Sequence, residues 1–315
     1  MNKVLNLSSS PHVRDSITTS EIMRDVCIAL LPTTIYGCIQ FGVHALFVVI
    51  FSTLFAVLAE YCYEKAMKLP ITIGDYSAAV TGLLIGLNCP PSIPIWIPCL
   101  GSVFAIIVVK QLYGGLGHNF MNPALAARCF LLLSFASKMT TWTVPGVDTM
   151  GGATPLAYLK ASPDHTANLL ALVFGRVPGT IGEVSKICIL IGAIYLIIRD
   201  VISPKIPFIY IATVAIFVAI FGGRGFDLYY ICSEIFGGGL MFGAFFMATD
   251  YVTSPITPKG QVIYALILGV ITGLFRLFGG SAEGVSYAII LTNIIVPTIN
   301  KKTIPVAFGK EGAKK

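Results

Sequence analysis

The chain has 315 residues, of which 56% are hydrophobic and 11% are charged, and its mean hydropathy is +0.84. Soluble domains carry about 25% charged residues, so this composition excludes an ordinary soluble enzyme and indicates a protein that crosses a membrane many times. The formal net charge of +6 comes from basic residues scattered over loops and the C-terminal tail, a distribution that does not predict nucleic-acid binding.

Apolar segments separated by short polar stretches run through most of the chain. Ten of them can be read from the sequence: 22–40, 43–63, 76–87, 95–110, 123–137, 184–198, 206–221, 237–248, 261–275 and 286–299. We expect each to be helical, because a chain inside a membrane must satisfy its backbone hydrogen bonds internally. The sequence therefore predicts an all-α polytopic membrane protein with about ten transmembrane helices.

Two of the segments are too short to cross a bilayer as one helix. Residues 76–87 run into a Pro-Pro loop, and residues 237–248 run into Thr249 and Asp250. A helix of about 12 residues is only about 18 Å long, whereas a full crossing needs about 20 residues. Both segments are predicted to be broken or half-membrane helices, completed by irregular backbone that other parts of the protein cover.

The two halves of the chain resemble each other. Motifs that begin at Gly82 and Gly114 recur at Gly243 and Gly279, at offsets of 161 and 165 residues. Each half contains about five apolar segments, and an odd number places the two halves in opposite orientations. Inverted repeats with short helices at matching positions predict a binding site between the repeats. Chance similarity between apolar, Gly-containing runs is the alternative.

The distribution of Lys and Arg predicts the orientation. With the N-terminus inside, 14 basic residues fall on the inner side and 6 on the outer side, in agreement with the positive-inside rule. We therefore expect both termini in the cytoplasm. The predicted organisation is a cytoplasmic N-terminal segment (1–21), a first membrane repeat (22–137), an external loop (138–185), a second membrane repeat (186–299) and a cytoplasmic basic tail (300–315).

The external loop contains the stretch 148–155, Asp-Thr-Met-Gly-Gly-Ala-Thr-Pro. Its two glycines allow the close approach of a bulky partner. Thr154 and Pro155 suit the N-cap and first position of a helix, where free N–H groups and the helix dipole favour a phosphate. On these residues alone, a capped loop helix is the simpler interpretation, and a phosphate attached to the Thr154 hydroxyl is the functional one.

Two further stretches place polar side chains beside predicted helices. Asn122 suits an N-cap before Pro123, and Asn119 and Asn122 offer amide groups to the edge of a ring system, although a structural re-entrant turn is equally consistent. Asp250 follows the second short helix, at a depth where a carboxylate is costly and usually functional. It is a candidate site for Na⁺ or H⁺, unless it lies at the interface and pairs with Lys259.

Other charged residues receive no functional role from the sequence. Arg128, within the helix begun by Pro123, is expected to form a structural ion pair. Five charged residues are expected near the membrane interface: Arg24, Asp25, Glu60, Glu64 and Asp75. The eight cysteines include no CxxC pair, which argues against an iron–sulfur or zinc site within this chain.

Three stretches together resemble one known family. Residues 148–156 resemble the flavinylation motif (Ser/Thr)-Gly-Ala-Thr of the Rnf D subunit and Nqr B subunit family, and the stretches 114–125 and 243–261 are also similar to it. The resemblance covers about Asp75 to Pro297. The chain lacks the longer N-terminal region typical of Nqr B subunits, which favours the Rnf D assignment, and Gly151 stands where the family usually has Ser or Thr.

The resemblance implies a membrane electron-transfer subunit of an ion-translocating ferredoxin:NAD oxidoreductase, driving Na⁺ or H⁺ transport. It implies FMN joined through its phosphate to Thr154. The residues that complete the attachment motif are Asp148, Gly152 and Ala153. It also implies a second, non-covalent flavin, riboflavin, which we place at Asn119 and Asn122.

The expected partners are the other Rnf subunits, the membrane lipid and no nucleic acid. Ferredoxin and NAD are expected on those other subunits, because this chain has neither a dinucleotide-binding GxGxxG nor a cluster-binding cysteine spacing. Two alternatives stay open. One is the B-type subunit of a Na⁺-pumping NADH:quinone reductase, and the other is a non-redox channel or transporter for a small polar solute, which would have no use for the 148–156 motif.

Overall fold

The structure is a computed structural model that describes residues 17–143, 154–161, 168–280 and 284–305. It is built of helices, and no β-strand occurs in these ranges. The helices of the first half are α1 (Thr19–Phe41), α2 (Val43–Ala66), α3 (Ser77–Leu87), α4 (Trp96–Phe104) and α5 (Pro123–Ser134). Its short elements are η1 (Ile73–Asp75), the π-helical η2 (Ala105–Lys110), η3 (Gln111–Tyr113) and α6 (Ala136–Met139).

The second half is also built of long and short helices. Two short helices, α7 (Pro155–Ala161) and α8 (Leu169–Phe174), lie between the halves in sequence. The remaining elements are α9 (Lys186–Ile198), α10 (Lys205–Phe221), α11 (Leu228–Phe236), α12 (Leu240–Phe242), the π-helical η4 (Gly243–Met247), α13 (Pro258–Phe278) and α14 (Val285–Thr303).

Each of the ten predicted apolar segments contains a helix, which confirms an all-helical chain of the polytopic membrane class. In the described ranges, four helices are long and apolar enough to cross a membrane: α1, α2, the run from Trp96 to Tyr113, and α13. A fifth is counted if α11 and α12–η4, which meet at 64°, form one broken span. The other apolar helices, α3, α5, α9 and α10, have 10–17 residues.

The end of α3 confirms the prediction of a half-helix covered by protein. Asn88 and Cys89, which follow the helix, are 2% and 1% exposed. The cover is the chain just before α9, because the Ile181 N–H donates to the Cys89 carbonyl (3.1 Å) and the Gly182 N–H donates to the Leu87 carbonyl (2.7 Å). The irregular backbone is therefore hydrogen-bonded away from lipid, as a membrane interior requires.

Part of the predicted external loop 138–185 is packed within the protein. Residues 179–186 are buried throughout, although Gly, Thr, Glu and Lys give this stretch the composition of a loop.

The second short apolar segment, predicted at 237–248, differs from the prediction in where it begins. It begins at Leu240, after the bend, and the preceding α11 was not predicted because its nine residues include Ser and Glu.

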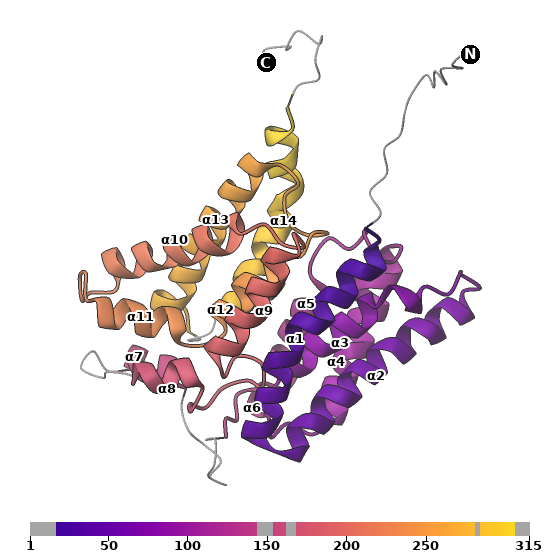
Figure 1. Cartoon of the computed structure of the whole chain (residues 1–315), viewed down its shortest axis with the longest axis horizontal. Coiled ribbons are helices and arrows are strands. Elements are labelled where there is room, and N and C mark those ends of the chain that lie inside the picture. The colour runs from indigo at the N-terminus through magenta and orange to yellow at the C-terminus, as the bar shows by residue number, and fades with distance from the viewer. Residues whose placement is uncertain (1–16, 144–153, 162–167, 281–283, 306–315) are drawn as a thin grey trace, which may run out of the picture.

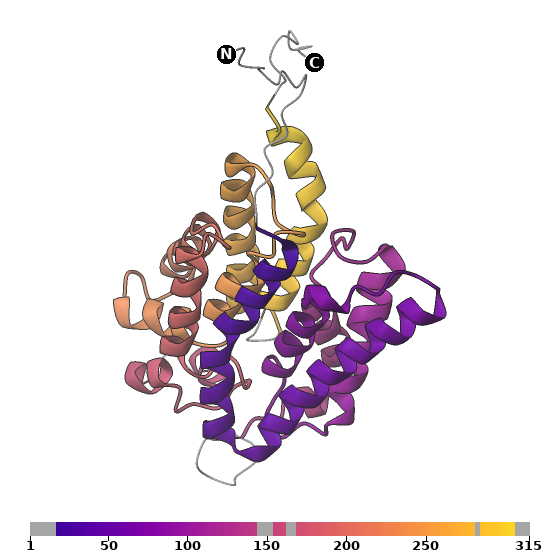
Figure 2. The ribbon, with the colours of Figure 1, turned by 45° about the vertical axis from the view of Figure 1, so that its right-hand side comes forward.

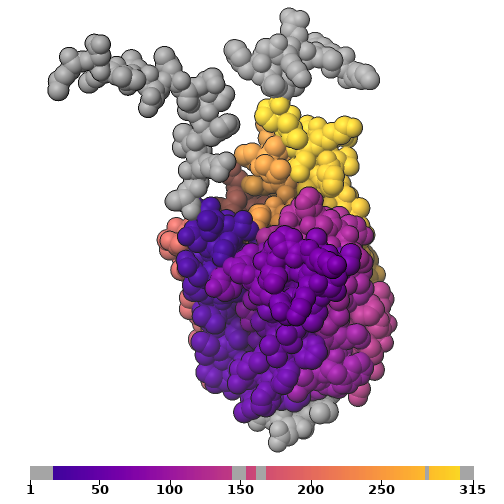
Figure 3. Space-filling view, turned by 90° about the vertical axis from the view of Figure 1, so that its right-hand side faces the viewer, coloured from indigo at the N-terminus to yellow at the C-terminus, as the bar shows by residue number. Residues whose placement is uncertain are grey.

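The two halves pack side by side and meet along α1 and α9 (Figure 1). The beginning of α1 and the end of α14 lie toward one end of the molecule, while α7 and α8 lie toward the other (Figures 1 and 2). Seen from the side of the first half, α1 and α2 form a continuous face, with the end of α14 rising beyond it (Figure 3). Many large apolar side chains of these helices are exposed, for example Ile35, Ile39 and Val43, which suits a surface in contact with lipid.

Close packing of α1 on α9 depends on Gly192. A Cβ added at this position would overlap the Ala29 carbonyl oxygen and lie 2.9 Å from Phe246 Cζ. We expect Gly192→Val to destabilise the protein by about 1–3 kcal/mol or more, because overpacking forces helices apart. Gly74→Ala is the matched control, since a Cβ there meets nothing within 4 Å. Thermal unfolding of the detergent-solubilised protein should show a lower midpoint for Gly192→Val alone, and equal midpoints would contradict this packing.

Candidate functional site

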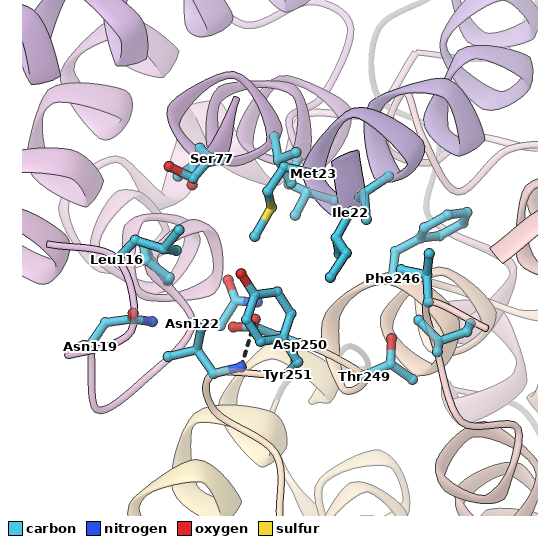
Figure 4. Close-up of a pocket in the computed structure, with 18 of the residues that line it drawn as sticks. Ile22, Met23, Ser77, Leu116, Asn119, Asn122, Phe246, Thr249, Asp250 and Tyr251 are labelled. Carbon is cyan, nitrogen blue, oxygen red and sulfur yellow. Dashed lines mark hydrogen bonds between the residues drawn. The ribbon is translucent and has the colours of Figure 1, made fainter. Parts of the chain in front are cut away.

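A cavity lies between the two halves, near the end of the molecule at which α1 begins. Its walls come from α1, α3, η2, the loop before α5, α9 and the connection from η4 to α13 (Figure 4). The polar residues among its lining are Ser77, Thr81, Lys110, Asn119, Asn122, Thr249, Asp250 and Tyr251. Polar residues predicted separately in the two halves, Asn119 and Asn122 in one and Asp250 in the other, thus share one cavity.

The size of the cavity limits what it can hold. The volume open to the centres of water molecules is about 80 Å³, whereas one water needs about 10–15 Å³. The cavity therefore accommodates several waters or a small ion. A flavin does not fit in this arrangement, because apolar side chains such as Met23 and Leu116 reach into the space (Figure 4).

Asn122 has the predicted N-cap role. Its side-chain Oδ1 accepts hydrogen bonds from the N–H groups of Ala124 (3.0 Å) and Leu125 (3.3 Å), and Pro123 occupies the first turn of α5. Its Nδ2 donates to the carbonyl of Met247 at 3.5 Å, across to the other half. Asn119 is 7% exposed and donates to the Met121 carbonyl at 3.1 Å. Both amides therefore stabilise the loop as well as line the cavity.

Asp250 begins the turn that follows η4. Its carboxylate accepts hydrogen bonds from the Val252 N–H (3.3 Å) and the Thr253 hydroxyl (3.1 Å). Among the described residues, no ion pair joins it to Lys259, so the alternative of a simple interfacial pair is not supported. Burial raises the pKa of Asp250 above its ordinary value, and the two hydrogen bonds oppose that shift. A carboxyl in this position can exchange a proton or accept a cation.

Thr154 lies at the start of α7, toward the opposite end of the molecule from the cavity. Its hydroxyl accepts a hydrogen bond from the Ala157 N–H at 3.3 Å, which confirms the predicted helix start, and the residue is 5% exposed. Lys160, in the same helix, donates to the Gly279 carbonyl at the end of α13. The other predicted attachment residues, Asp148, Gly152 and Ala153, lie outside the described residues.

An apolar groove lies beside Gly279. It is lined by residues of α5, α13 and α14: Cys129, Leu133, Phe275, Gly279, Gly280, Gly284, Tyr287, Ile290 and Leu291. Its volume of about 500 Å³ falls within the range of about 300–1,000 Å³ that small-molecule sites occupy. The groove was not predicted, because α5 is distant in sequence from α13 and α14, which form its other walls.

Arg128 lies buried at the end of α3. Its guanidinium donates to the Asn88 side-chain oxygen at 2.6 Å, so it joins α5 to the irregular backbone that ends the half-helix. Asn88 also approaches the second half, because its Nδ2 lies 3.9 Å from the Met247 sulfur. The ends of the two short helices, α3 and η4, therefore meet where Asn88 contacts Met247.

Arg24 and Asp25, both expected near the membrane interface, have different surroundings in the structure. Adjacent residues in a helix do not face each other. Asp25 is buried and pairs instead with Arg199 of α9 at 3.0 Å and with the Tyr195 hydroxyl at 3.1 Å, whereas Arg24 is exposed. Glu60 and Glu64, also expected near the interface, are buried within the protein, at 0% and 2% exposure.

A model of the NQR2, RnfD, RnfE family matches residues 6–309. The chain belongs to this family. The resemblance predicted from three stretches is thereby confirmed over nearly the whole length of the sequence.

Relatives from several bacteria are similar to this family member along their full lengths. It is 47% identical to the D subunit of the Na⁺-translocating ferredoxin:NAD⁺ oxidoreductase complex of Acetobacterium woodii, with 100% of this chain and 99% of the relative covered. It is 44% identical to the D subunit of the proton-translocating ferredoxin:NAD⁺ oxidoreductase complex of Clostridium ljungdahlii (97% and 96% covered). It is 34% identical to the D subunit of the ion-translocating oxidoreductase complex of Alcanivorax borkumensis (98% of each covered).

Proposed function

We propose that this protein is the membrane-embedded D subunit of an Rnf-type, ion-translocating ferredoxin:NAD oxidoreductase complex. The observation that carries the proposal is the full-length similarity, at 47% and 44% identity, to two subunits with that name. The other Rnf subunits are then its partners, and ferredoxin and NAD bind on those partners. The two relatives translocate different ions, so the similarity does not choose between Na⁺ and H⁺.

The proposal is tested on the native complex. An affinity tag on this chain should co-purify further subunits, and the complex should reduce NAD with ferredoxin and move an ion across liposome membranes. Quinone reduction with NADH, in place of ferredoxin-dependent NAD reduction, would instead favour a B-type subunit of a NADH:quinone reductase. Solute uptake by the chain alone, without partners or redox chemistry, would favour the transporter alternative.

Covalent FMN at Thr154 is the second part of the proposal. Support comes from the Thr154 hydroxyl at a helix start and from the apolar groove beside Gly279, to which Lys160 of the same helix is bonded. The groove has the size and lining for a flavin ring, so the residues fit the group. Esterification replaces only the hydroxyl proton, so Thr154 Oγ1 can still accept the hydrogen bond from the Ala157 N–H. Bound FMN would supply the electron-transfer chemistry, while the chain supplies its position and surroundings.

The binding of riboflavin at Asn119 and Asn122 stays a prediction. The cavity is too small for it in this structure. The two amides line the space, but a volume of about 80 Å³ requires the surrounding side chains to move before a ring system can enter. We therefore derive no step of the reaction through a second flavin.

The arrangement of the helices supports ten spans in two inverted repeats. The start of α1 and the end of α14 lie at one end of the molecule, and α7 lies toward the other (Figure 1). Asn88 and Met247, at the ends of the two short helices, lie together, as the midplane ends of inverted half-helices do. Together with the positive-inside rule, this arrangement supports a cytoplasmic position for both termini and a position near the outer face for Thr154.

Asp250 is proposed to bind or carry the translocated cation. We expect Asp250→Asn to reduce ion transport per NAD formed by about tenfold to hundredfold, because loss of a charged partner costs about 1.5–3 kcal/mol. Protonation competes with a bound cation, so transport of a metal cation should fall as the pH drops through the pKa of Asp250, which burial has raised.

The matched control for this prediction is Asp200→Asn. Asp200 is an exposed carboxylate with a positive φ of 54°, a conformation that Asn tolerates. Transport should be measured in proteoliposomes over a range of pH. Equal transport by wild type and Asp250→Asn would remove Asp250 from the ion path.

A further inference from the structure

A buried, charged network lies behind the cavity wall, where α2, η1 and η2 meet. The Lys110 ammonium group contacts Glu60 Oε1 at 2.5 Å and the Ser77 hydroxyl at 2.5 Å. The Gln111 amide donates to the same Glu60 oxygen at 2.8 Å and to Glu64 Oε1 at 3.4 Å. All five residues are 7% exposed or less. Sequence patterns assign no role to these residues, because carboxylates near the end of an apolar run resemble interfacial ones.

The network connects the cavity to the loop that precedes α3. Lys110 and Ser77 line the cavity, and the Ser77 hydroxyl donates to Asp75 at 2.5 Å. At the other end, Glu64 accepts hydrogen bonds from the N–H (3.0 Å) and the hydroxyl of Thr72. Lys110 also ends the π-helical η2, and π-helical segments within helices recur at functional sites.

The charges in this network do not balance when every carboxylate is ionised. Glu60 pairs with the one cation, Lys110, Glu64 shares the Gln111 amide with Glu60, and Asp75 adds a third carboxylate, bonded to Ser77. The neighbouring helices do not supply the missing positive charge: α3 and α4 contain no charged residue, and on α1 Arg24 is exposed while Asp25 pairs with Arg199. Two buried carboxylates beside one ammonium group favour the state in which one of them is protonated.

One atom identifies which carboxylate takes the proton. Glu60 Oε2 has no hydrogen-bond partner among the described residues, and Glu60 is fully buried. Both oxygens of Glu64, in contrast, accept hydrogen bonds. An ionised oxygen without a partner is costly in a buried site, whereas a protonated one is neutral. Protonation of Glu60 at Oε1, the oxygen that Lys110 contacts, leaves the unpartnered Oε2 as an uncharged carbonyl oxygen.

We propose that Glu60 holds an exchangeable proton, which reaches it from the cavity through Lys110. In this step Lys110 passes one ammonium proton to Glu60 Oε1, the oxygen that it contacts, breaking an N–H bond and forming an O–H bond. Lys110 then regains a proton from a hydronium ion in the cavity, which leaves water. The net change is one carboxylate converted to a carboxylic acid, with Lys110 still positively charged and Glu64 still ionised. This site adds a proton-exchanging group beyond the proposed function and does not depend on FMN at Thr154.

The test is infrared difference spectroscopy of the purified native complex while the pH is changed. Wild type should show the C=O stretching band of a buried carboxylic acid, and the band should shift when H₂O is replaced by D₂O. Glu60→Gln should remove that band, whereas Asp200→Asn, at an exposed carboxylate outside the network, should leave it in place. A band that persists in full in Glu60→Gln, or that is absent from wild type, would overturn the proposal.

Glu60→Asp is a second variant, for the case in which Glu60→Gln prevents assembly of the complex. It keeps a carboxyl group beside Lys110 but moves it by one methylene, so the band should persist at a displaced frequency. A band unchanged in position in Glu60→Asp would show that another residue carries the proton. Size-exclusion chromatography of each variant establishes that the complex has assembled before its spectrum is compared.

Discussion

A Thr154→Ala variant is expected to assemble in the membrane, to carry no covalent flavin, and to lose ferredoxin-dependent NAD reduction to the background level. Alanine removes the hydroxyl that would be esterified. It also removes the acceptor for the Ala157 N–H, which costs about 0.5–2 kcal/mol as the loss of an N-cap. That loss is too small to unfold a protein of this size, so absence of activity would report on the cofactor.

Thr154→Ser is the matched control for this experiment. Serine keeps both the hydroxyl and the N-cap interaction, so covalent flavin and activity should be retained in part or in full. The measurements are flavin fluorescence on a denaturing gel and NAD reduction by the purified complex. Normal electron transfer by a flavin-free Thr154→Ala complex would contradict the assigned role.

The second large effect is expected at Arg276, which fixes α11 to α13. Its buried guanidinium donates to the backbone carbonyls of Glu234 and Gly237 (3.0 Å to the latter) and lies 3.4 Å from the Glu234 carboxylate. Arg276→Met should destabilise the protein by about 3–5 kcal/mol, because it leaves a buried carboxylate without its cation. The loss should appear as a lower thermal midpoint of the solubilised complex.

Two further variants distinguish the loss of the ion pair between Arg276 and Glu234 from a general disruption of the fold. Arg276→Met combined with Glu234→Gln should recover part of the lost stability, since the unpaired charge is then gone. Arg24→Met, at an exposed arginine, should change stability by only about 0–1 kcal/mol. If Arg276→Met unfolded at the same temperature as Arg24→Met, the buried pair would have no structural importance.

The sequence predicted those features that depend on local chemistry. Asn122 before Pro123 and Thr154 before Pro155 both begin helices, because N-cap side chains and proline act within one turn. The half-helix ending at Leu87 followed from its length and the Pro-Pro loop. Hydrophobic periodicity and turn residues are local signals, and they determined where the helices of this chain lie.

Features that depend on tertiary contacts could not be predicted in the same way. Glu60 and Lys110 are 50 residues apart, and only the packing of α2 against η2 makes them a pair. Residues 179–186 look soluble until Ile181 and Gly182 are seen to cover the end of α3. That Asn122 and Asp250 share a cavity was implied only weakly by the internal repeat, since repeat symmetry predicts a shared interface but not its side chains.

The most direct measurement is mass spectrometry of the tryptic peptide from Met139 to Lys160, taken from the complex purified from its native host. We expect a mass increase equal to FMN less one water, localised to Thr154. An unmodified peptide from a complex that still transfers electrons from ferredoxin to NAD would contradict this assignment, and the electron transfer would then have to proceed without a covalent flavin on this chain.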